Sequence, residues 1–277
     1  MPLRDWPGKR LIGGANLLRG RGRRFADAPR KVAALSRLAR EESADAVVCT
    51  GDLSALGTDA ELEAARSGVQ PFFEAPLGFV CIPGNHDLYT RSVVREQRFD
   101  RHFGDALFSD LPEQCTDGQW PVVRLLREQA AVIAVNSARP NLPWKSSGRI
   151  PDSQLEGLRT ILALEEIRRR FVFVATHYAP LRADGSPDTP LHGLDNAGAL
   201  MDVCAGIRRG AILCGHIHHA FRYAIPPDLY CGGSATMDGY EAAWWFEIEE
   251  LRTTVRPVHW DGNAWSLGPA DERTLVG

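Results

Sequence analysis

The sequence predicts an α/β fold in which helices pack on the faces of a sheet. Two observations lead to this prediction: short apolar runs with β-branched residues recur along the chain, and segments with apolar residues at helical spacing separate them. Such alternation of strand and helix is typical of a sheet that is covered by helices. Hydrophobic residues make up 44% of the 277 residues and charged residues 24%, which is typical of a folded globular chain.

The expected elements follow one another from residue 26 onward. The first helix is expected where Val32, Leu35 and Leu38 recur at helical spacing, and it leads into a strand. The strands expected from short apolar runs lie at residues 46–49, 78–82, 131–135, 171–175 and 211–214. The further helices expected between them lie at residues 59–69, 152–169 and 197–208.

The C-terminal part, residues 220–277, has a different pattern. Turn signals separate short apolar runs, which predicts an antiparallel meander with strands at 223–225, 229–231, 243–248 and 253–258. Neither an internal repeat nor a low-complexity linker divides the chain. We therefore expect a single domain over residues 1–277.

Residues 1–31 form a basic N-terminal stretch. They hold nine Lys and Arg residues against the two acids Asp5 and Asp27. Contact with a phosphate or with a membrane surface is one interpretation of this charge. A solvated loop that leads into the first helix is the other, because several glycines interrupt any long amphipathic helix in this stretch.

Charge and cysteine content restrict the partners and the compartment. The formal net charge of -3 gives no overall field that would attract nucleic acid or anionic lipid. The six cysteines form no Cys-x-x-Cys pair, as expected of free thiols in a reducing compartment. No apolar stretch approaches the roughly 18 to 20 residues of a transmembrane helix, and the N-terminus does not have the pattern of a secretory signal. We expect a cytoplasmic protein, and the sequence leaves its oligomeric state open.

Four of the expected strands lead into residues that can bind a metal ion. These continuations are Thr50-Gly51-Asp52, Gly84-Asn85-His86-Asp87, Thr176-His177 and Gly215-His216-Ile217-His218. Open α/β sheets bind ligands beyond the carboxyl ends of their strands, so we expect these side chains to meet there. A single Gly-Asp or a single His would be explained by a turn or a buried core residue. Together they predict a centre for Mn, Fe, Zn or Co, which suit Asp, Asn and His donors.

These motifs and their order resemble the calcineurin-like metallophosphoesterases, from about residue 30 to residue 260. The pattern of that family is Asp-x-His, Gly-Asp, Gly-Asn-His-Asp/Glu, a single His and Gly-His-x-His. The resemblance implies a four-layer α-β-β-α sandwich of two mixed sheets with helices outside, and a binuclear metal centre. It also implies that Asp52 bridges the two ions and that His218 belongs to the first site. The residues that it implies for the second site are Asn85, His177 and His216.

The implied centre would hydrolyse phosphoesters. Two cations about 3.5 to 4 Å apart and joined by Asp52 can share a hydroxide that attacks phosphorus. His86 cannot easily bind the same ion as its neighbour Asn85, so we expect it to be catalytic, protonating the leaving oxygen or stabilising phosphoryl charge. Asp87 either orients that imidazole or has a plain turn or cap role. The expected metals are Mn, Fe or Zn.

The motifs are most similar to those of the cyclic-nucleotide phosphodiesterase branch, which makes a phosphodiester, cyclic nucleotides included, the expected small-molecule substrate. Phosphomonoesterases, nucleases and phosphoprotein phosphatases use the same ligands, and loops decide between these activities. Loop residues that could border the pocket are Arg139 and Arg149 for phosphate contact, Trp144 for base stacking and His192 as part of a cap. An ordinary surface loop is the competing interpretation for each.

The first motif of the family, Asp-x-His, is absent from this sequence. No His precedes Asp52, and no earlier Asp follows an apolar run. Under one hypothesis, the protein is an active phosphoesterase whose true start lies upstream and includes an N-terminal strand with this motif. Under the other, the chain is an N-terminally truncated, one-metal or inactive protein that acts as a binding module. An open frame upstream of Met1 that encodes an apolar strand and Asp-x-His would support the first hypothesis, and an immediate stop codon would exclude it.

Overall fold

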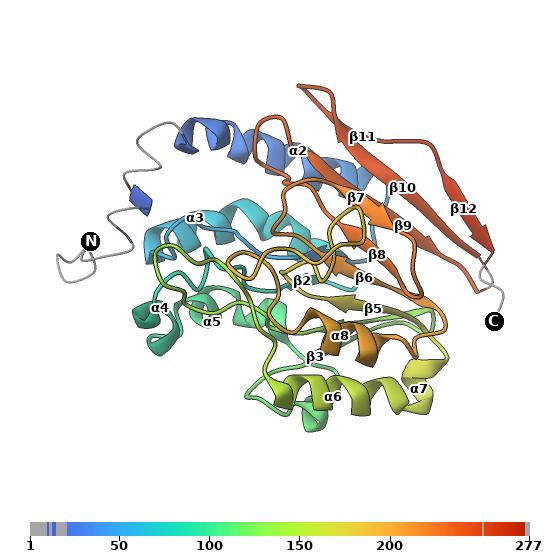
Figure 1. The fold of residues 1–277 in the computed structure, drawn as a ribbon. Coiled ribbons are helices and arrows are strands. Elements are labelled where there is room, and N and C mark those ends of the chain that lie inside the picture. Colours follow the sequence, from blue (N-terminus) through green and yellow to red (C-terminus); the bar gives the residue numbers. More distant parts are fainter. Residues whose placement is uncertain (1–9, 11–12, 15–20, 251, 275–277) are drawn as a thin grey trace.

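The computed structural model describes residues 10, 13–14, 21–250 and 252–274 (Figure 1). Its largest sheet consists of β3 (Val122–Leu126), β4 (Ala130–Ala134), β5 (Phe171–Ala175), β6 (Gly210–Cys214), β7 (Phe221–Tyr223) and β8 (Asp228–Cys231). The order of these six strands is β3-β4-β5-β6-β8-β7. The inner strands run parallel to one another, and β3 and β7 pair antiparallel at the two edges.

The remaining strands form two smaller sheets. β1 (Val47–Cys49) pairs in parallel with β2 (Phe79–Cys81). In the other sheet, β10 (Arg252–Trp260) pairs antiparallel with β9 (Ala242–Ile248), β11 (Trp265–Leu267) and β12 (Asp271–Thr274). The resemblance implied a second mixed sheet. The described residues instead form a parallel pair and an antiparallel sheet, and no hydrogen-bonded strand among them connects the two.

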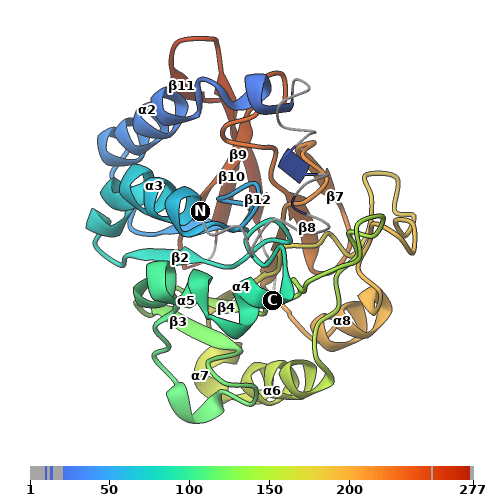
Figure 2. The same ribbon diagram turned by 90° about the vertical axis from the view of Figure 1, so that its left-hand side faces the viewer.

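Helices cover the strands from two sides. The α-helices are α2 (Ala28–Glu41), α3 (Asp59–Val69), α4 (Arg91–Arg95), α5 (Arg98–Phe103), α6 (Asp152–Ala163), α7 (Glu165–Arg168) and α8 (Ala197–Cys204). Short 3-10 helices are η2 (Arg21–Phe25), η3 (Gln70–Glu74), η4 (Gly104–Leu107) and η5 (Pro112–Gln114). Figures 1 and 2 show α2 and α3 on one side of the strands and α6 and α8 on the other. The predicted α/β class is confirmed.

Aromatic side chains pack the antiparallel sheet against the six-stranded sheet. The ring of Phe246 in β9 lies 5.0 Å from the ring of Phe173 in β5 and 5.0 Å from that of Tyr230 in β8. Trp244 also packs on Tyr230, and its indole N–H donates to the carbonyl oxygen of Cys231 at 2.9 Å. Because aromatic residues bury large apolar areas, these contacts are a main source of cohesion between the two sheets.

Most predicted elements are present, and two of them have the predicted bounds, namely α3 and β5. The helix predicted over residues 152–169 is divided into α6 and α7 at Leu164, whose backbone is extended. α8 ends at Cys204 and not at residue 208, and the nearby Gly206 does not favour a longer helix. The elements that the sequence did not predict are β3, α4, α5, β11 and β12, together with the short 3-10 helices η2 to η5.

The predicted C-terminal meander is partly wrong. β9 and β10 pair antiparallel, as predicted, and the unpredicted strands β11 and β12 pair antiparallel with β10. β7 and β8 join the six-stranded sheet instead, where β8 pairs in parallel with β6. Leu229, Tyr230 and Cys231 of β8 are buried, because a strand inside a covered parallel sheet has an interior environment on both faces.

The described part of the basic N-terminal stretch contacts the protein itself. The side chain of Lys31 is 2% exposed and forms ion pairs with Asp238 and Glu241, both at 2.5 Å. The guanidinium of Arg24 lies over the ring of Tyr240 at 4.8 Å. These contacts give Arg24 and Lys31 a structural role. The phosphate or membrane contact considered for this stretch falls largely on residues 1–20, most of which lie outside the described residues.

Two further findings concern the cysteines and the helices. All six cysteines are free thiols, as predicted. In the part of the chain that the structure describes, no helix is both long enough and apolar enough to span a membrane.

Candidate functional site

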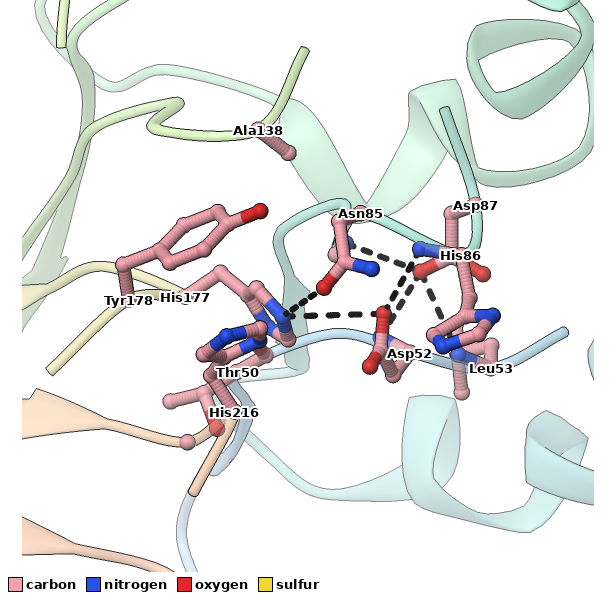
Figure 3. A network of polar contacts seen from close by, with 12 residues as sticks. Thr50, Asp52, Leu53, Asn85, His86, Asp87, Ala138, His177, Tyr178 and His216 are labelled. Atoms are coloured by element: carbon pink, nitrogen blue, oxygen red, sulfur yellow. Dashed lines mark hydrogen bonds and ion pairs between the residues drawn. The ribbon is translucent and has the colours of Figure 1, made fainter. Parts of the chain in front are cut away.

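The four predicted motifs meet beyond the carboxyl ends of β1, β2, β5 and β6. One ligand atom each of Asp52, His177 and His216 lie within 4.8 Å of one another. The amide oxygen of Asn85 lies 3.2 Å from Nε2 of His177, which places it in the same cluster (Figure 3). Residues 33 to 164 positions apart along the chain thus converge on one site, as the order of the strands predicted.

Asp52 owes its position to a close approach between the loop that follows β1 and the loop that follows β2. A Cβ atom at Gly84 would lie 2.1 Å from Oδ1 of Asp52, and a Cβ atom at Gly51 would lie 2.5 Å from the Gly84 nitrogen. Both loops can meet only because these positions lack a side chain. The backbone N–H of His86 donates to Oδ1 of Asp52 at 2.9 Å, and Nε2 of His177 lies 3.6 Å from the same oxygen.

Asp87 holds the same two loops together. Its side chain is fully buried and accepts hydrogen bonds from backbone N–H groups of both loops, those of Asp52 (2.8 Å), Leu53 (3.2 Å), Ser54 (2.9 Å) and Gly84 (2.9 Å). Of the two roles considered for Asp87, the turn role is therefore correct. The orientation of the His86 imidazole has another source, because its Nδ1 lies 2.7 Å from the carbonyl oxygen of Ala55.

Backbone carbonyls orient the two buried imidazoles of the cluster. Nδ1 of His177 lies 2.6 Å from the carbonyl oxygen of Thr50, and Nε2 of His216 lies 3.1 Å from that of His192. A carbonyl oxygen only accepts, so each of these ring nitrogens carries the proton in a neutral imidazole. The opposite nitrogens, Nε2 of His177 and Nδ1 of His216, are therefore the ones with a lone pair for a metal.

Burial and neighbouring imidazoles set the charge of the cluster. Burial alone would raise the pKa of Asp52, but His177, His86 and His216 outweigh it and lower this pKa to about 2. Burial lowers the pKa of His216 to about 2, so its imidazole is neutral near pH 7. Burial, with the charge of Asp52 as a second cause, raises the pKa of Asp87 to about 6. An ionised carboxylate beside a neutral imidazole is the state in which both groups donate to a metal.

His86 and His218 line one cavity together with Asp52. The ring of His86 stacks on that of Tyr89 with centroids 5.7 Å apart. His218 has a φ of +65° and is half-buried. Of the described residues, the tight cluster contains Asp52, His177 and His216, and His218 lies outside it.

The sequence did not identify three groups that contact the site. Two are the carbonyl oxygens of Thr50 and His192, which carry no residue-specific signal because every residue has one. The third is Tyr178, a fully buried residue whose ring lies 4.2 Å from that of His216 and 5.1 Å from that of His177. Its position directly after His177 was the only available signal.

The loop residues singled out for substrate contact have partners within the protein. Arg139 pairs with Asp195, which also lies 3.5 Å from Lys145. Arg149 pairs with Asp152 at 2.7 Å, and the side chain of His192 pairs with Asp188 at 2.5 Å. Trp144 is 71% exposed. His192 contacts the site through its backbone and its ring, which lies 4.2 Å from that of His216.

Comparisons with known proteins identify the family and a similar fold. A family model described as calcineurin-like phosphoesterase matches residues 24–220. Among solved structures, a dimetal phosphatase from Danio rerio is similar at a TM-score of 0.65 and 14% identity, covering 91% of this chain and 90% of that chain. Vacuolar protein sorting 29 from Cryptosporidium parvum gives a TM-score of 0.37 at 12% identity, covering 85% and 87%. A search of curated proteins found no match.

Proposed function

The chain belongs to the calcineurin-like phosphoesterase family, and we propose that within this family of metal-dependent hydrolases it acts as a phosphodiesterase. The metal ligands of the proposal are Asp52, Asn85, His177, His216 and His218, with His86 as the catalytic residue. The single observation that carries the proposed metal-dependent activity is the convergence of Asp52, His177 and His216 within 4.8 Å. The same proposal treats residues 1–277 as one metallophosphoesterase domain.

The donor set fits a divalent transition metal. Asp52 supplies an ionised carboxylate, and Asn85 supplies an amide oxygen. His177 and His216 supply imidazoles whose hydrogen bonds to the carbonyl oxygens of Thr50 and His192 leave the opposite ring nitrogen with a lone pair. Carboxylate, amide and imidazole donors suit Mn, Fe or Zn. In a binuclear centre, Asp52 and His218 would together hold the other ion. Divalent cations bound here would activate water and hold phosphoryl oxygens.

His86 is placed to transfer a proton. Its Nδ1 donates to the carbonyl oxygen of Ala55, and this fixes the ring on the wall of the cavity that also contains Asp52. In its protonated form, Nε2 would give a proton to the alkoxide that leaves phosphorus, so that the product alcohol is neutral and the imidazole becomes neutral. Such proton transfer contributes roughly 10² to 10⁴ in rate.

The test of this role is His86→Ala in the metal-loaded protein. We expect hydrolysis of a diester with an alkoxide leaving group, such as a cyclic nucleotide, to fall by about 10² or more, while bound metal is unchanged. His219→Ala is the matched control, since His219 is exposed and its ring packs on Tyr240 at 4.6 Å. Equal activity of the His86 variant and the control would refute the catalytic role.

The preference for diesters rests on the similarity of Gly84-Asn85-His86-Asp87 and Gly215-His216-Ile217-His218 to cyclic-nucleotide phosphodiesterases. We expect the diester bis-p-nitrophenyl phosphate to turn over faster than p-nitrophenyl phosphate, and cyclic nucleotides to compete with it. Faster turnover of the monoester would contradict the preference.

A one-metal or inactive binding module is the second candidate. One observation favours it: His218 lies outside the tight cluster, and the described donors therefore suffice for one ion. Loading with Mn and measuring metal per protein decides between the two. Two tightly held ions would exclude the second candidate, and one ion without hydrolysis would exclude the first.

The proposed location is the cytoplasm. Support comes from the six cysteines, all of which are free thiols, as expected where glutathione keeps them reduced.

A further inference from the structure

Tyr178 is a buried residue beside the metal-ligand cluster whose hydroxyl is not paired within the protein. The residue is 0% exposed. Among the described residues, none offers a hydrogen-bond partner to its Oη, and bulk solvent does not reach this atom. A buried hydroxyl without a partner costs stability, because it has lost its bonds to water and gained none in return. Such a group in a functional site calls for an explanation, and a ligand that pairs with it on binding is one.

The ring of Tyr178 is fixed by several contacts. It lies 4.2 Å from the ring of His216 and 5.1 Å from that of His177. A Cβ atom at Gly148 would lie 2.3 Å from Cδ2 and 2.5 Å from Cε2 of the ring, so the Gly148 backbone packs directly against it. The backbone N–H of Tyr178 donates to Oγ of Ser137 at 3.3 Å. The fold therefore sets the position of the hydroxyl, which cannot turn to another partner without displacing these contacts.

The hydroxyl is directed toward the ligand cluster. Figure 3 shows it on the end of the ring that faces Asn85. Asn141 is a polar neighbour of the hydroxyl from the loop after β4. The amide nitrogen of Asn141 already donates to the carbonyl oxygens of Arg139 at 3.2 Å and Ser147 at 2.8 Å. The hydroxyl thus remains available to a group that is bound at the cluster.

The chemistry of the hydroxyl determines which group this is. A phenol keeps its proton near pH 7 and is a hydrogen-bond donor, so it needs an acceptor. The lone pairs of the His177 and His216 imidazoles are the ones that would bind a metal ion, which leaves the acceptor to the ligand. Because the hydroxyl is closed to bulk solvent, that acceptor must be an oxygen held inside the site. An anionic phosphoryl oxygen is the strongest acceptor that a phosphoester supplies.

We propose that Tyr178 is a substrate-binding residue, whose hydroxyl donates a hydrogen bond to a phosphoryl oxygen of the phosphoester and of the phosphate product. The proposal rests on the proposed function of the site and adds a phosphate contact to it. The hydroxyl is left unpaired in the free protein and gains its partner when the phosphoryl group binds. The bond is therefore worth more to binding than an exchange of one partner for another would be.

The experiment replaces Tyr178 by Phe, which removes the hydroxyl and keeps the ring that packs on His177 and His216. Inorganic phosphate is titrated into the Mn-loaded wild type and variant, and its affinity is measured by calorimetry. We expect the variant to bind phosphate at least about tenfold more weakly, because a hydrogen bond to a charged oxygen is lost. Bound Mn per protein should be unchanged, since no metal donor is removed.

The matched control is Tyr230→Phe. Tyr230 is 3% exposed and lies in β8, where its ring packs on Trp244 at 5.2 Å and on Phe246 at 5.0 Å. Its variant also loses the hydroxyl of a buried tyrosine, but outside the ligand cluster. We expect it to bind phosphate as tightly as the wild type does.

Thermal unfolding of the metal-free proteins separates binding from a structural role. An unpaired hydroxyl contributes nothing favourable to the free fold, so the Tm of Tyr178→Phe should equal or exceed that of the wild type. A structural hydroxyl would give the opposite pattern, with a lower Tm and unchanged phosphate affinity. Either a lower Tm of the variant or equal phosphate affinity of variant and wild type would overturn the proposal.

The outcome also separates this proposal from the proposed function. If the Mn-loaded wild type binds phosphate and Tyr178→Phe binds it equally well, only the role of Tyr178 is refuted. If the loaded wild type binds no phosphate, the proposed function fails, and the role of Tyr178 fails with it. None of these measurements requires turnover of a substrate.

Discussion

The six-stranded sheet and the β1 and β9 region are built from similar sequences but differ in burial. β4 and β5 are buried at every position, and each has strand partners on both edges. β1 has an equally apolar sequence, Val47-Val48-Cys49, yet all three residues are half-buried and border the cavity. The difference teaches that an apolar β-branched run is not sufficient for burial. A strand becomes interior only when neighbours cover both of its edges and both of its faces.

The candidate site depends on both regions. Asp52 and Asn85 follow β1 and β2, whereas His177 and His216 follow β5 and β6 of the six-stranded sheet. The bond between Nδ1 of His177 and the carbonyl oxygen of Thr50 connects the two regions directly. Substitutions in the six-stranded sheet and in the β1 and β9 region therefore show whether the two regions differ in their contribution to metal binding and to the free energy of unfolding.

The largest effect is expected where the two regions meet. His177→Ala removes a metal donor and the bond to Thr50, so we expect Mn affinity to fall by at least about 100-fold, with hydrolysis lost in parallel. Titration of the apoprotein with Mn measures the affinity. His102→Ala is the control, because His102 contacts Asp59 at the surface and should leave binding unchanged. Unchanged affinity in the His177 variant would separate this residue from the metal site.

Matched valines compare the stability of the two regions. Val174→Ala in β5 removes a fully buried side chain and should lower the free energy of unfolding by about 2 to 3 kcal/mol. Val48→Ala in β1, beside the cavity, should cost less than about 1 kcal/mol. Urea unfolding of both variants gives the two values. Equal losses of stability in the two variants would contradict the comparison.

The contact between α2 and the loop before β9 has a pH-dependent component. Lys31→Met leaves the Glu241 carboxylate without its cation, and we expect a loss of about 1 to 3 kcal/mol at pH 7. Burial tends to raise the pKa of Glu241, but the hydrogen bond and charge of Lys31 outweigh it and lower this pKa. A lowered carboxyl pKa stabilises the fold above the unfolded pKa, and this contribution disappears as pH falls through the folded pKa. Unfolding measured down an acidic series should therefore show the difference between wild type and variant shrinking.

The smallest effects are expected from two helix glycines. A Cβ at Gly68 in α3 meets no atom within 4 Å and lies beside the cavity, so Gly68→Ala should stabilise the protein by about 0.4 to 1 kcal/mol. A Cβ at Gly157 in α6 would lie 2.5 Å from Oγ1 of Thr116, so Gly157→Ala should destabilise it. Thermal unfolding of the pair gives the two signs. A loss of stability in both variants would show that the α3 side is packed as tightly as the α6 side.

The sequence by itself determined the α/β class, most strand positions and the residues that follow each strand. α3 has its predicted bounds because its signals are local: Thr58 and Glu61 form a capping box at its start, and its apolar residues recur at helical spacing. The meeting of Asp52, Asn85, His177 and His216 followed from their positions after strands, because the carboxyl ends of parallel strands share one edge.

The tertiary structure alone decided which strands pair and which backbone groups reach the site. β8 joined β6 and not the C-terminal meander, since the choice of partner depends on contacts between distant segments. The imidazoles of His177 and His216 donate hydrogen bonds to the carbonyl oxygens of Thr50 and His192, and Asp87 accepts hydrogen bonds from the loops after β1 and β2. These contacts depend on how closely segments that are distant in the sequence approach one another. β1 and β9 each have one edge without a strand partner among the described residues, and the sequence could not show this, because whether an edge is covered depends on neighbours in space and not on the strand's own sequence.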